Sequence, residues 1–272
     1  MRGRTILSIG IGLLVSVAMA GCTSEAPTVE TEQIHGVVES VAQAFSIGDI
    51  PAYAAGFTDA GLLDDQDVAR ADFLKMDPAE FGGLPVKITE WGDTVVDGDK
   101  ATAEVVMEIG DTWVNGYTLH LLKQDELWRL DAGVESDTYS FPLPDGVTPV
   151  DVELIDFAFA FDDITEAPQA FDLRNNGEQE HEAVLFRLDE AHNAAELVDL
   201  VLSSEGPEGP EGVEFIAAAS ALPGQDARLL LKQPLLPGEY AFMCFFDDTT
   251  DPGHIHLEKG MVKTFTVEES TS

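Results

Sequence analysis

The chain has 272 residues, with 51 Asp or Glu against only 14 Lys or Arg, and a formal net charge of −37 at pH 7. This charge excludes nucleic acid as a partner, because phosphate binding depends on clustered Lys and Arg that release counterions. Anionic lipid headgroups are repelled for the same reason. A cationic redox partner protein or a metal cation suits such a field, although acidity also simply keeps an exported protein soluble.

The first residues predict export. Two arginines precede an apolar run over residues 6–17, and small residues then lead to Ala20-Gly21-Cys22. The run is shorter than the roughly 20 residues that a spanning helix needs, so residues 1–21 are predicted to be a cleaved signal peptide. The segment resembles the bacterial lipobox, which implies a lipoprotein anchored through Cys22 on the extracytoplasmic face of the cell membrane. Ordinary secretion with Cys22 as a spare thiol is the alternative. Residues 22–31 are expected to form a polar tether.

The N-terminal half changes its hydrophobic period once. Apolar residues at helical spacing predict a helix through residues 34–45, a second helix from Pro51 and a third helical piece from Asp67 to Leu74. The period then becomes two, which predicts strands near Val86–Val96, Lys100–Ile109, Tyr117–Lys123 and Glu126–Asp131, with tight turns at Asp97-Gly98 and Asn115-Gly116. Helices followed by a meander of strands indicate an α+β domain, in which the helices cover the concave face of one antiparallel sheet.

Three segments of this half carry a family resemblance: Ala44–Asp49 in the first helix, Thr94–Ala103 in the first hairpin, and the closing Leu127–Asp131. The half resembles the SnoaL-like cone fold of the nuclear transport factor superfamily, and residues 32–137 are assigned to that domain. The resemblance implies a pocket that binds a small-molecule ligand.

No catalytic constellation is found in the cone, so the chain is not predicted to be an enzyme. His120 lies in a strand among leucines, where a structural histidine is expected. Four aromatic residues either line the pocket or fill the core, and core is favoured because large rings dominate packing in small domains: Trp91, Trp113, Tyr117 and Trp128.

A Pro-rich segment, Ser140–Gly146, marks a linker over residues 138–149. The following domain, residues 150–269, is nearly all β, with one helix over Ala194–Leu202 and an exposed Gly/Pro loop over residues 206–212. Its strands are predicted at Asp151–Phe161, Ala170–Arg174, His181–Leu188, Val213–Ala218, Ala227–Leu231, Glu239–Phe246 and Met261–Val267. Short strands separated by turn residues indicate an all-β Greek-key sandwich.

Soft and imidazole donors gather in this second domain. Cys and Met sulfur favour Cu(I), while imidazole accepts both oxidation states of copper. The segments Phe171–Gly177, His181-Glu182, Leu236–Cys244 and His256 with Gly260-Met261 resemble the cupredoxins, the blue copper fold. In that family the first His opens a strand and the Cys ends one, so the resemblance implies that antiparallel neighbours bring His181 and Cys244 together at one end of the sandwich.

The resemblance implies a type 1 copper site. His181 and His256 would be the nitrogen ligands, Cys244 the thiolate and Met261 the long axial contact. His256 stands five residues before Met261, the interval of a plastocyanin-like loop, which favours it over His254. Such a set leaves no open position for substrate.

The interval between Cys244 and His256 departs from the family. It holds an acidic insert, residues 247–253, and is longer than in most blue copper loops. Loop closure costs little extra entropy as a loop lengthens, but the insert is expected to reduce the rigidity and dryness of the site. Its Asp247, Asp248 and Asp251 are an alternative set of oxygen ligands for Ca²⁺.

The sequence therefore predicts a lipid-anchored copper-binding protein that transfers single electrons or handles copper. If Cys22 carries lipid, Cys244 is the one remaining cysteine and no internal disulfide forms. The alternative is a metal-free binding or docking protein that uses the cone pocket. In it, His181 is a strand-edge residue, Cys244 a buried small hydrophobic residue and Met261 a core residue of a sandwich that has lost copper. The oligomeric state, the redox partner and the pocket ligand stay open.

Overall fold

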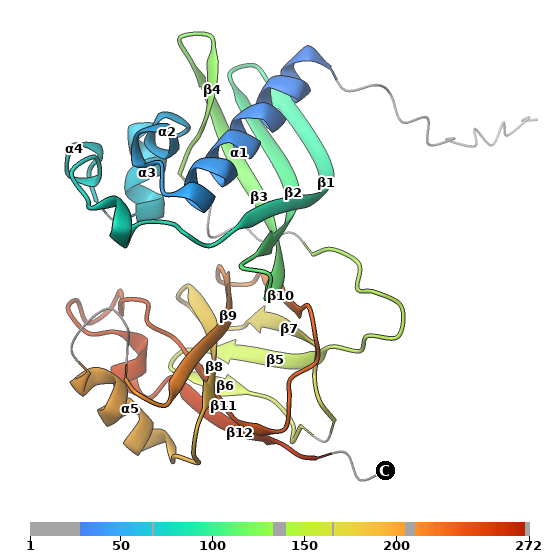
Figure 1. Ribbon diagram of the computed structural model, residues 1–272, viewed down its shortest axis with the longest axis vertical. Helices are drawn as coiled ribbons and strands as arrows, with labels where there is room; N and C mark the ends of the chain where they lie inside the picture. Colours follow the sequence, from blue (N-terminus) through green and yellow to red (C-terminus); the bar gives the residue numbers. More distant parts are fainter. Residues whose placement is uncertain (1–27, 67, 133–139, 165, 205–209, 270–272) are drawn as a thin grey trace, which may run out of the picture.

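A computed structural model describes residues 28–66, 68–132, 140–164, 166–204 and 210–269 (Figure 1). The predicted signal peptide, Cys22 and most of the predicted tether lie outside these residues, as does part of the Gly/Pro loop. No helix within the described ranges is long and apolar enough to span a membrane.

The N-terminal half contains four α-helices and one 3₁₀ turn in its described residues: α1 (Val29–Ile47), α2 (Ile50–Ala55), α3 (Asp59–Gln66), α4 (Arg70–Phe73) and η1 (Pro78–Glu80). Helix α1 begins inside the predicted tether, because Thr28 caps it by accepting a hydrogen bond from the backbone N–H of Thr31. Helix α4 lies within the helical piece predicted over Asp67–Leu74, and α3 is a further short helix that precedes it.

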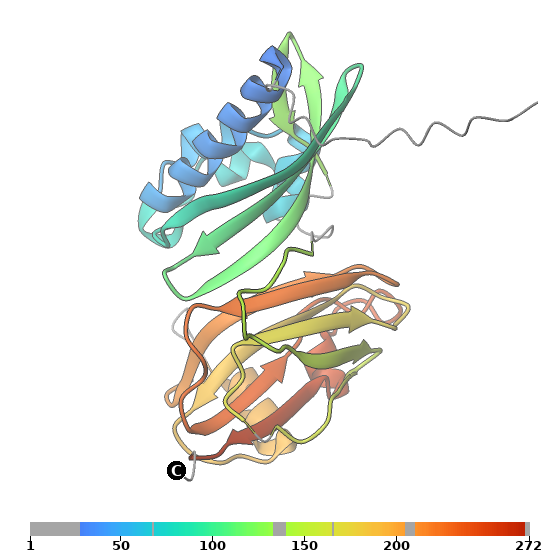
Figure 2. The same ribbon diagram turned by 90° about the vertical axis from the view of Figure 1, so that its right-hand side faces the viewer.

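Four strands with antiparallel pairing form the other layer of this half: β1 (Val86–Asp97), β2 (Lys100–Ile109), β3 (Trp113–Gln124) and β4 (Leu127–Leu130). Helix α1 lies diagonally across the sheet (Figures 1 and 2) and buries Ile34, Val38 and Val41 among the sheet's apolar side chains. This arrangement confirms the predicted cone of helices on a curved sheet.

The turn predicted at Asn115-Gly116 is wrong, since both residues lie within β3. Asn115 is 3 % exposed, and its side-chain amide donates to the carbonyl of Ala218 at 2.7 Å and to the Tyr117 hydroxyl at 3.0 Å. A strand from the other half of the chain pairs with the backbone at Asn115. The sequence around Asn115-Gly116 carries no sign of that strand.

The C-terminal half is a sandwich of two sheets with helix α5 (Ala194–Ser203) beside it. Its strands are β5 (Val150–Ile155), β6 (Ala158–Ala160), β7 (Ala170–Asn175), β8 (His181–Leu188), β9 (Val213–Ala221), β10 (Asp226–Leu231), β11 (Gly238–Met243) and β12 (Val262–Val267), and a 3₁₀ turn, η2, covers His256–Lys259. One sheet continues β10-β7-β5-β6 and the other is β12-β11-β8-β9. The apolar faces meet in a core that contains Phe171, Phe242 and Phe265, and the predicted all-β sandwich is confirmed.

The single strand predicted over Asp151–Phe161 is two strands, β5 and β6, joined by a turn at Asp156 and Phe157. Phe157 has a positive φ of 64°, which ends the extended backbone there. This turn brings Asp156 to the candidate site described below.

The two halves share one sheet. The first residues of β3 pair antiparallel with β10, and Trp113 opposes Leu231 in the register. The eight-stranded sheet therefore runs from the cone into the sandwich without interruption. The Trp113 ring packs edge-on against Phe215 of β9, with centroids 5.4 Å apart. Shared backbone hydrogen bonds and a shared apolar contact therefore join the two halves.

Candidate metal centre

Three donor residues come from three separate elements at one end of the sandwich. His181 is the first residue of β8, Cys244 directly follows β11, and His256 begins the turn η2. Strands β8 and β11 pair antiparallel, so the start of one lies beside the end of the other. His181 and Cys244 therefore lie close together, as expected from the resemblance.

The donor atoms of these residues converge. Nδ1 of His181 lies 3.1 Å from Nδ1 of His256, and Sγ of Cys244 lies 3.3 Å from the same His256 atom. All three side chains are buried, and their ligand atoms lie within 4.8 Å of one another. Nε2 of His256 is buried without a hydrogen-bond partner among the described residues. Two imidazoles and a thiol directed at one point are a donor set that fits copper.

Met261 and His254 lie in different surroundings. Met261 is completely buried, its N–H donates to the carbonyl of His256 at 3.0 Å, and its carbonyl accepts from the N–H of Cys244 at 3.2 Å. His254 is exposed and its Nδ1 pairs with Glu258 at 2.9 Å. Of the two histidines that the sequence left open, the fold brings His256 to the group.

Burial controls the electrostatics of the group. It raises the pKa of the Cys244 thiol to about 12, so the sulfur keeps its proton unless a cation replaces it. Burial and the neighbouring His181 lower the pKa of His256. Burial also raises the pKa of Glu182 to about 7, and the side chain of Glu182 accepts a hydrogen bond from the N–H of Phe245 at 2.8 Å. That bond fixes the start of β8 to the residue after Cys244.

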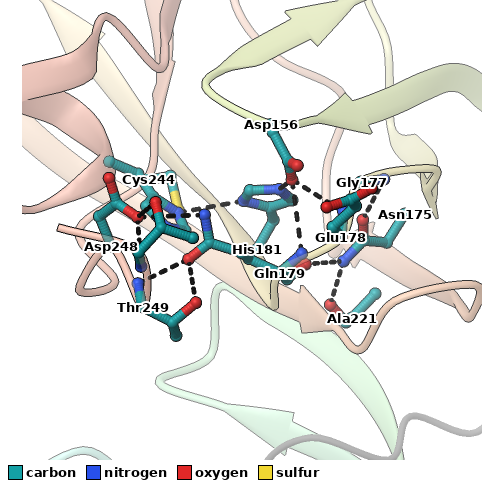
Figure 3. Close-up of polar contacts among 12 residues, drawn as sticks. Asp156, Asn175, Gly177, Glu178, Gln179, His181, Ala221, Cys244, Asp248 and Thr249 are labelled. Carbon is teal, nitrogen blue, oxygen red and sulfur yellow. Dashed lines mark hydrogen bonds and ion pairs between the residues drawn. The ribbon is translucent and has the colours of Figure 1, made fainter.

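Asp156 is a member of the site that sequence reasoning missed. Its Oδ1 lies 2.9 Å from Nε2 of His181, on the side of the ring opposite the other donors (Figure 3). Although burial raises the pKa of Asp156, hydrogen bonds from His181 and from the backbone of Glu178 and Gln179 hold it below its usual range. The only sequence signal was the short polar interruption of the predicted strand, and one carboxylate among 51 acidic residues gives no further hint.

Hydrogen bonds join residues of the acidic insert to one another and to the loop before β8. Asp248 is 2 % exposed and accepts from both the N–H and the hydroxyl of Thr250. The side-chain oxygen of Gln179 accepts from the N–H and the hydroxyl of Thr249, both at 2.6 Å (Figure 3). Because Gln179 stands two residues before His181, these bonds tie the insert to the loop that carries the first histidine. Asp248 is occupied by these partners and by Lys259, which leaves it poorly suited to calcium.

The cone contains a separate cavity of about 380 Å³. Apolar side chains of α1, α2 and the sheet line it, together with Phe215 from the sandwich. Trp113 and Tyr117 are among the lining residues, whereas Trp128 belongs to the core and Trp91 stacks on His35. Of the four aromatic residues, two therefore line the cavity and two do not. His120 is half-buried in β3, where it pairs with Thr102.

No protein-family model matches the chain, and no curated protein matches it in sequence. Among solved structures, the chain is similar to a dithionite-reduced auracyanin from the photosynthetic bacterium Roseiflexus castenholzii, at 21 % identity over 45 % of this chain and 98 % of that chain, with a TM-score of 0.29. It is also similar to auracyanin B, at 24 % identity over 44 % of this chain and 90 % of that chain, with a TM-score of 0.29.

A second group of similar structures consists of NTF2-like proteins. One of unknown function from Shewanella oneidensis MR-1 is 20 % identical over 38 % of this chain and 95 % of that chain, with a TM-score of 0.30. At such identities and scores, the function of these proteins is not transferred to this chain. The description of the protein as a cone of helices on a curved sheet joined to an all-β sandwich rests on the strand order and pairing described above.

Proposed function

We propose that the protein binds one copper ion through His181, Cys244 and His256, with Met261 as a fourth, axial contact, and that it transfers single electrons or carries copper. The observation that supports this proposal most strongly is the convergence of two Nδ1 atoms and one thiol sulfur in a buried position. Copper bound there would alternate between Cu(I) and Cu(II) and so accept and release one electron.

The surrounding residues hold these donors in place. Backbone bonds from Met261 to Cys244 and to His256 fix the two loops against each other, and the Asp156 carboxylate orients His181. Burial of all three donors excludes water from the group. A dry and rigid site limits the rearrangement that accompanies a change of charge, which suits electron transfer.

The location and the partner are part of the same proposal. The sequence before Cys22 supports attachment to lipid on the extracytoplasmic face of a membrane. A net charge of −37 supports a cationic redox partner, since complementary charge speeds encounter. Anionic membrane surfaces would repel the folded domains, so lipid would be the main source of membrane affinity.

Titration with Cu(II) tests the proposal. The protein used is residues 23–272, which lack the predicted signal peptide and Cys22 and include every element that the structure describes. We expect one equivalent of copper to bind and to give an intense visible band from thiolate-to-copper charge transfer. Absorption spectroscopy and metal analysis measure the band and the stoichiometry. Colourless protein that retains no copper after gel filtration would contradict it.

The cone cavity supports a second candidate function, the binding of an apolar small molecule. Its walls are mostly apolar, and Asp65 is the one charged residue that lines it; Oδ2 of Asp65 accepts a hydrogen bond from the Tyr53 hydroxyl at 2.5 Å. A volume of about 380 Å³ falls within the range of small-molecule sites. The ligand class that fits is therefore an apolar molecule with one hydrogen-bonding group.

We expect the neutral dye Nile red to bind this cavity with a blue-shifted emission. Ala42→Phe adds a ring to the cavity wall and should weaken binding about tenfold, or about 1.4 kcal/mol. Ala52→Phe is the matched control, because Ala52 is exposed on α2. Equal dye affinity in the two variants would exclude the cavity as the binding site.

A further inference from the structure

The turn between β5 and β6 contacts both imidazoles of the group, although none of its residues belongs to the proposed copper ligands. Oδ1 of Asp156 accepts three hydrogen bonds, from His181 Nε2 at 2.9 Å, the N–H of Glu178 at 2.9 Å and the N–H of Gln179 at 3.4 Å (Figure 3). Because three donors from one loop meet a single oxygen, the carboxylate is held in a fixed orientation toward the His181 ring.

The next residue of the turn contacts the second histidine. The Phe157 ring meets the His256 ring edge-on, with centroids 5.3 Å apart. Phe157 has a φ of 64°, a left-handed conformation that is strained for a bulky residue and persists where its surroundings fix it. The strained backbone allows Asp156 to face His181 while Phe157 faces His256.

Gly177 provides the space for this contact. A Cβ at position 177 would lie 2.4 Å from Oδ1 of Asp156 and 2.6 Å from Nε2 of His181. Any other residue there would therefore separate the two atoms. The N–H of Gly177 is in turn held by the side chain of Asn175 at 2.8 Å, so the loop before β8 is fitted to the Asp156–His181 pair.

We infer that Asp156 is a positioning residue of the metal centre: it holds His181 in the tautomer with the proton on Nε2, directs Nδ1 to the metal, and stabilises the oxidised form of a bound copper ion. An ionised carboxylate can only accept hydrogen bonds, so Nε2 is the donor and Nδ1 keeps its lone pair. A carboxylate on the far nitrogen makes the imidazole a more basic ligand. This inference rests on the proposed copper function.

The first experiment needs no metal. Nitrogen-15 NMR of the metal-free protein reports which ring nitrogen of His181 carries the proton. We expect the Nε2–H tautomer in the wild type and in Asp156→Asn, because an asparagine oxygen at the Oδ1 position still accepts the three hydrogen bonds. Asp156→Ala and Gly177→Ala should yield a mixture of tautomers, since the first removes the acceptor and the second displaces it.

The second experiment measures copper affinity and reduction potential on the same variants. We expect Asp156→Ala to bind Cu(II) about 10- to 100-fold more weakly. Asp156→Asn removes the charge alone and should shift the ratio of Cu(II) to Cu(I) affinity about tenfold toward Cu(I), which raises the potential by about 59 mV. Glu153→Gln is the matched control, because it removes one charge from an exposed position of β5, the strand that leads to Asp156.

The outcomes separate this inference from the copper proposal. If the wild type binds copper but Asp156→Asn has the potential of Glu153→Gln, the electrostatic role of Asp156 is refuted. An unchanged His181 tautomer in Asp156→Ala refutes the positioning role. A wild type that binds no copper refutes the proposed function together with the electrostatic role, and the tautomer measurement still decides whether Asp156 orients His181.

Discussion

Replacement of Cys244 with alanine is expected to abolish the visible charge-transfer band of the Cu(II)-loaded protein. The sulfur is the one thiol among the described residues and lies 3.3 Å from Nδ1 of His256. Without it the group retains two imidazoles, which are common ligands for many divalent metals. Copper affinity should fall by more than the roughly 10- to 100-fold typical of losing an outer-shell partner.

Met243→Leu is the control for disturbance of the strand. Met243 precedes Cys244 and is equally buried, but it belongs to the small apolar cluster near α5 rather than to the main core of the sandwich. We expect this variant to retain the band, as measured by absorption at one equivalent of copper. A Cys244→Ala protein with the wild-type band would refute Cys244 as the thiolate ligand, whereas a Met243→Leu protein without the band would attribute the loss to disturbance of the strand.

Replacement of Trp113 with alanine is expected to lower the free energy of unfolding by about 3–5 kcal/mol, the usual cost of deleting a large buried aromatic side chain. Trp113 is 6 % exposed, packs in the core of the sandwich and contacts Phe215. It is also the first residue of β3, the strand of the cone that pairs with β10 of the sandwich. The variant therefore loses packing at the point where the cone and the sandwich join.

Guanidinium denaturation followed by circular dichroism measures this effect. Because β3 and β10 belong to one continuous sheet, we expect the wild type to unfold in a single transition and the variant to separate into two. Trp91→Ala is the control, since Trp91 is only partly buried and lies in the cone away from the junction. Two separate wild-type transitions, or equal losses in the two variants, would show that the shared sheet does not couple the halves.

The local pattern of the chain predicted much of the fold. The helical spacing of Ile34, Val38 and Val41 buries one face of α1, and the period of two in the following segment forms β1 and β2 within one residue of the expected bounds. The predicted strand His181–Leu188 is β8. These elements are set by short-range periodicity, which a single sequence displays directly.

The contacts that complete the site are of another kind. Asp156 reaches His181 across 25 residues, and Gln179 reaches Thr249 across 70. Neither pair leaves a mark in local composition, because each depends on the register of strands and on the exact turn that separates β5 from β6. The Asn115-Gly116 dipeptide was misleading for the same reason: a distant strand, β10, pairs with the segment and overrides its local preference for a turn.

The sequence by itself determined the identity and order of His181, Cys244, His256 and Met261, together with the two classes of domain, because these depend on residue type, spacing and hydrophobic period. The tertiary structure alone decided that Asp156 contacts His181, that the acidic insert is tied to Gln179, and that β3 joins β10 in one sheet. Such contacts form only after long loops have closed, so their energies depend on the three-dimensional positions of groups that are far apart along the chain.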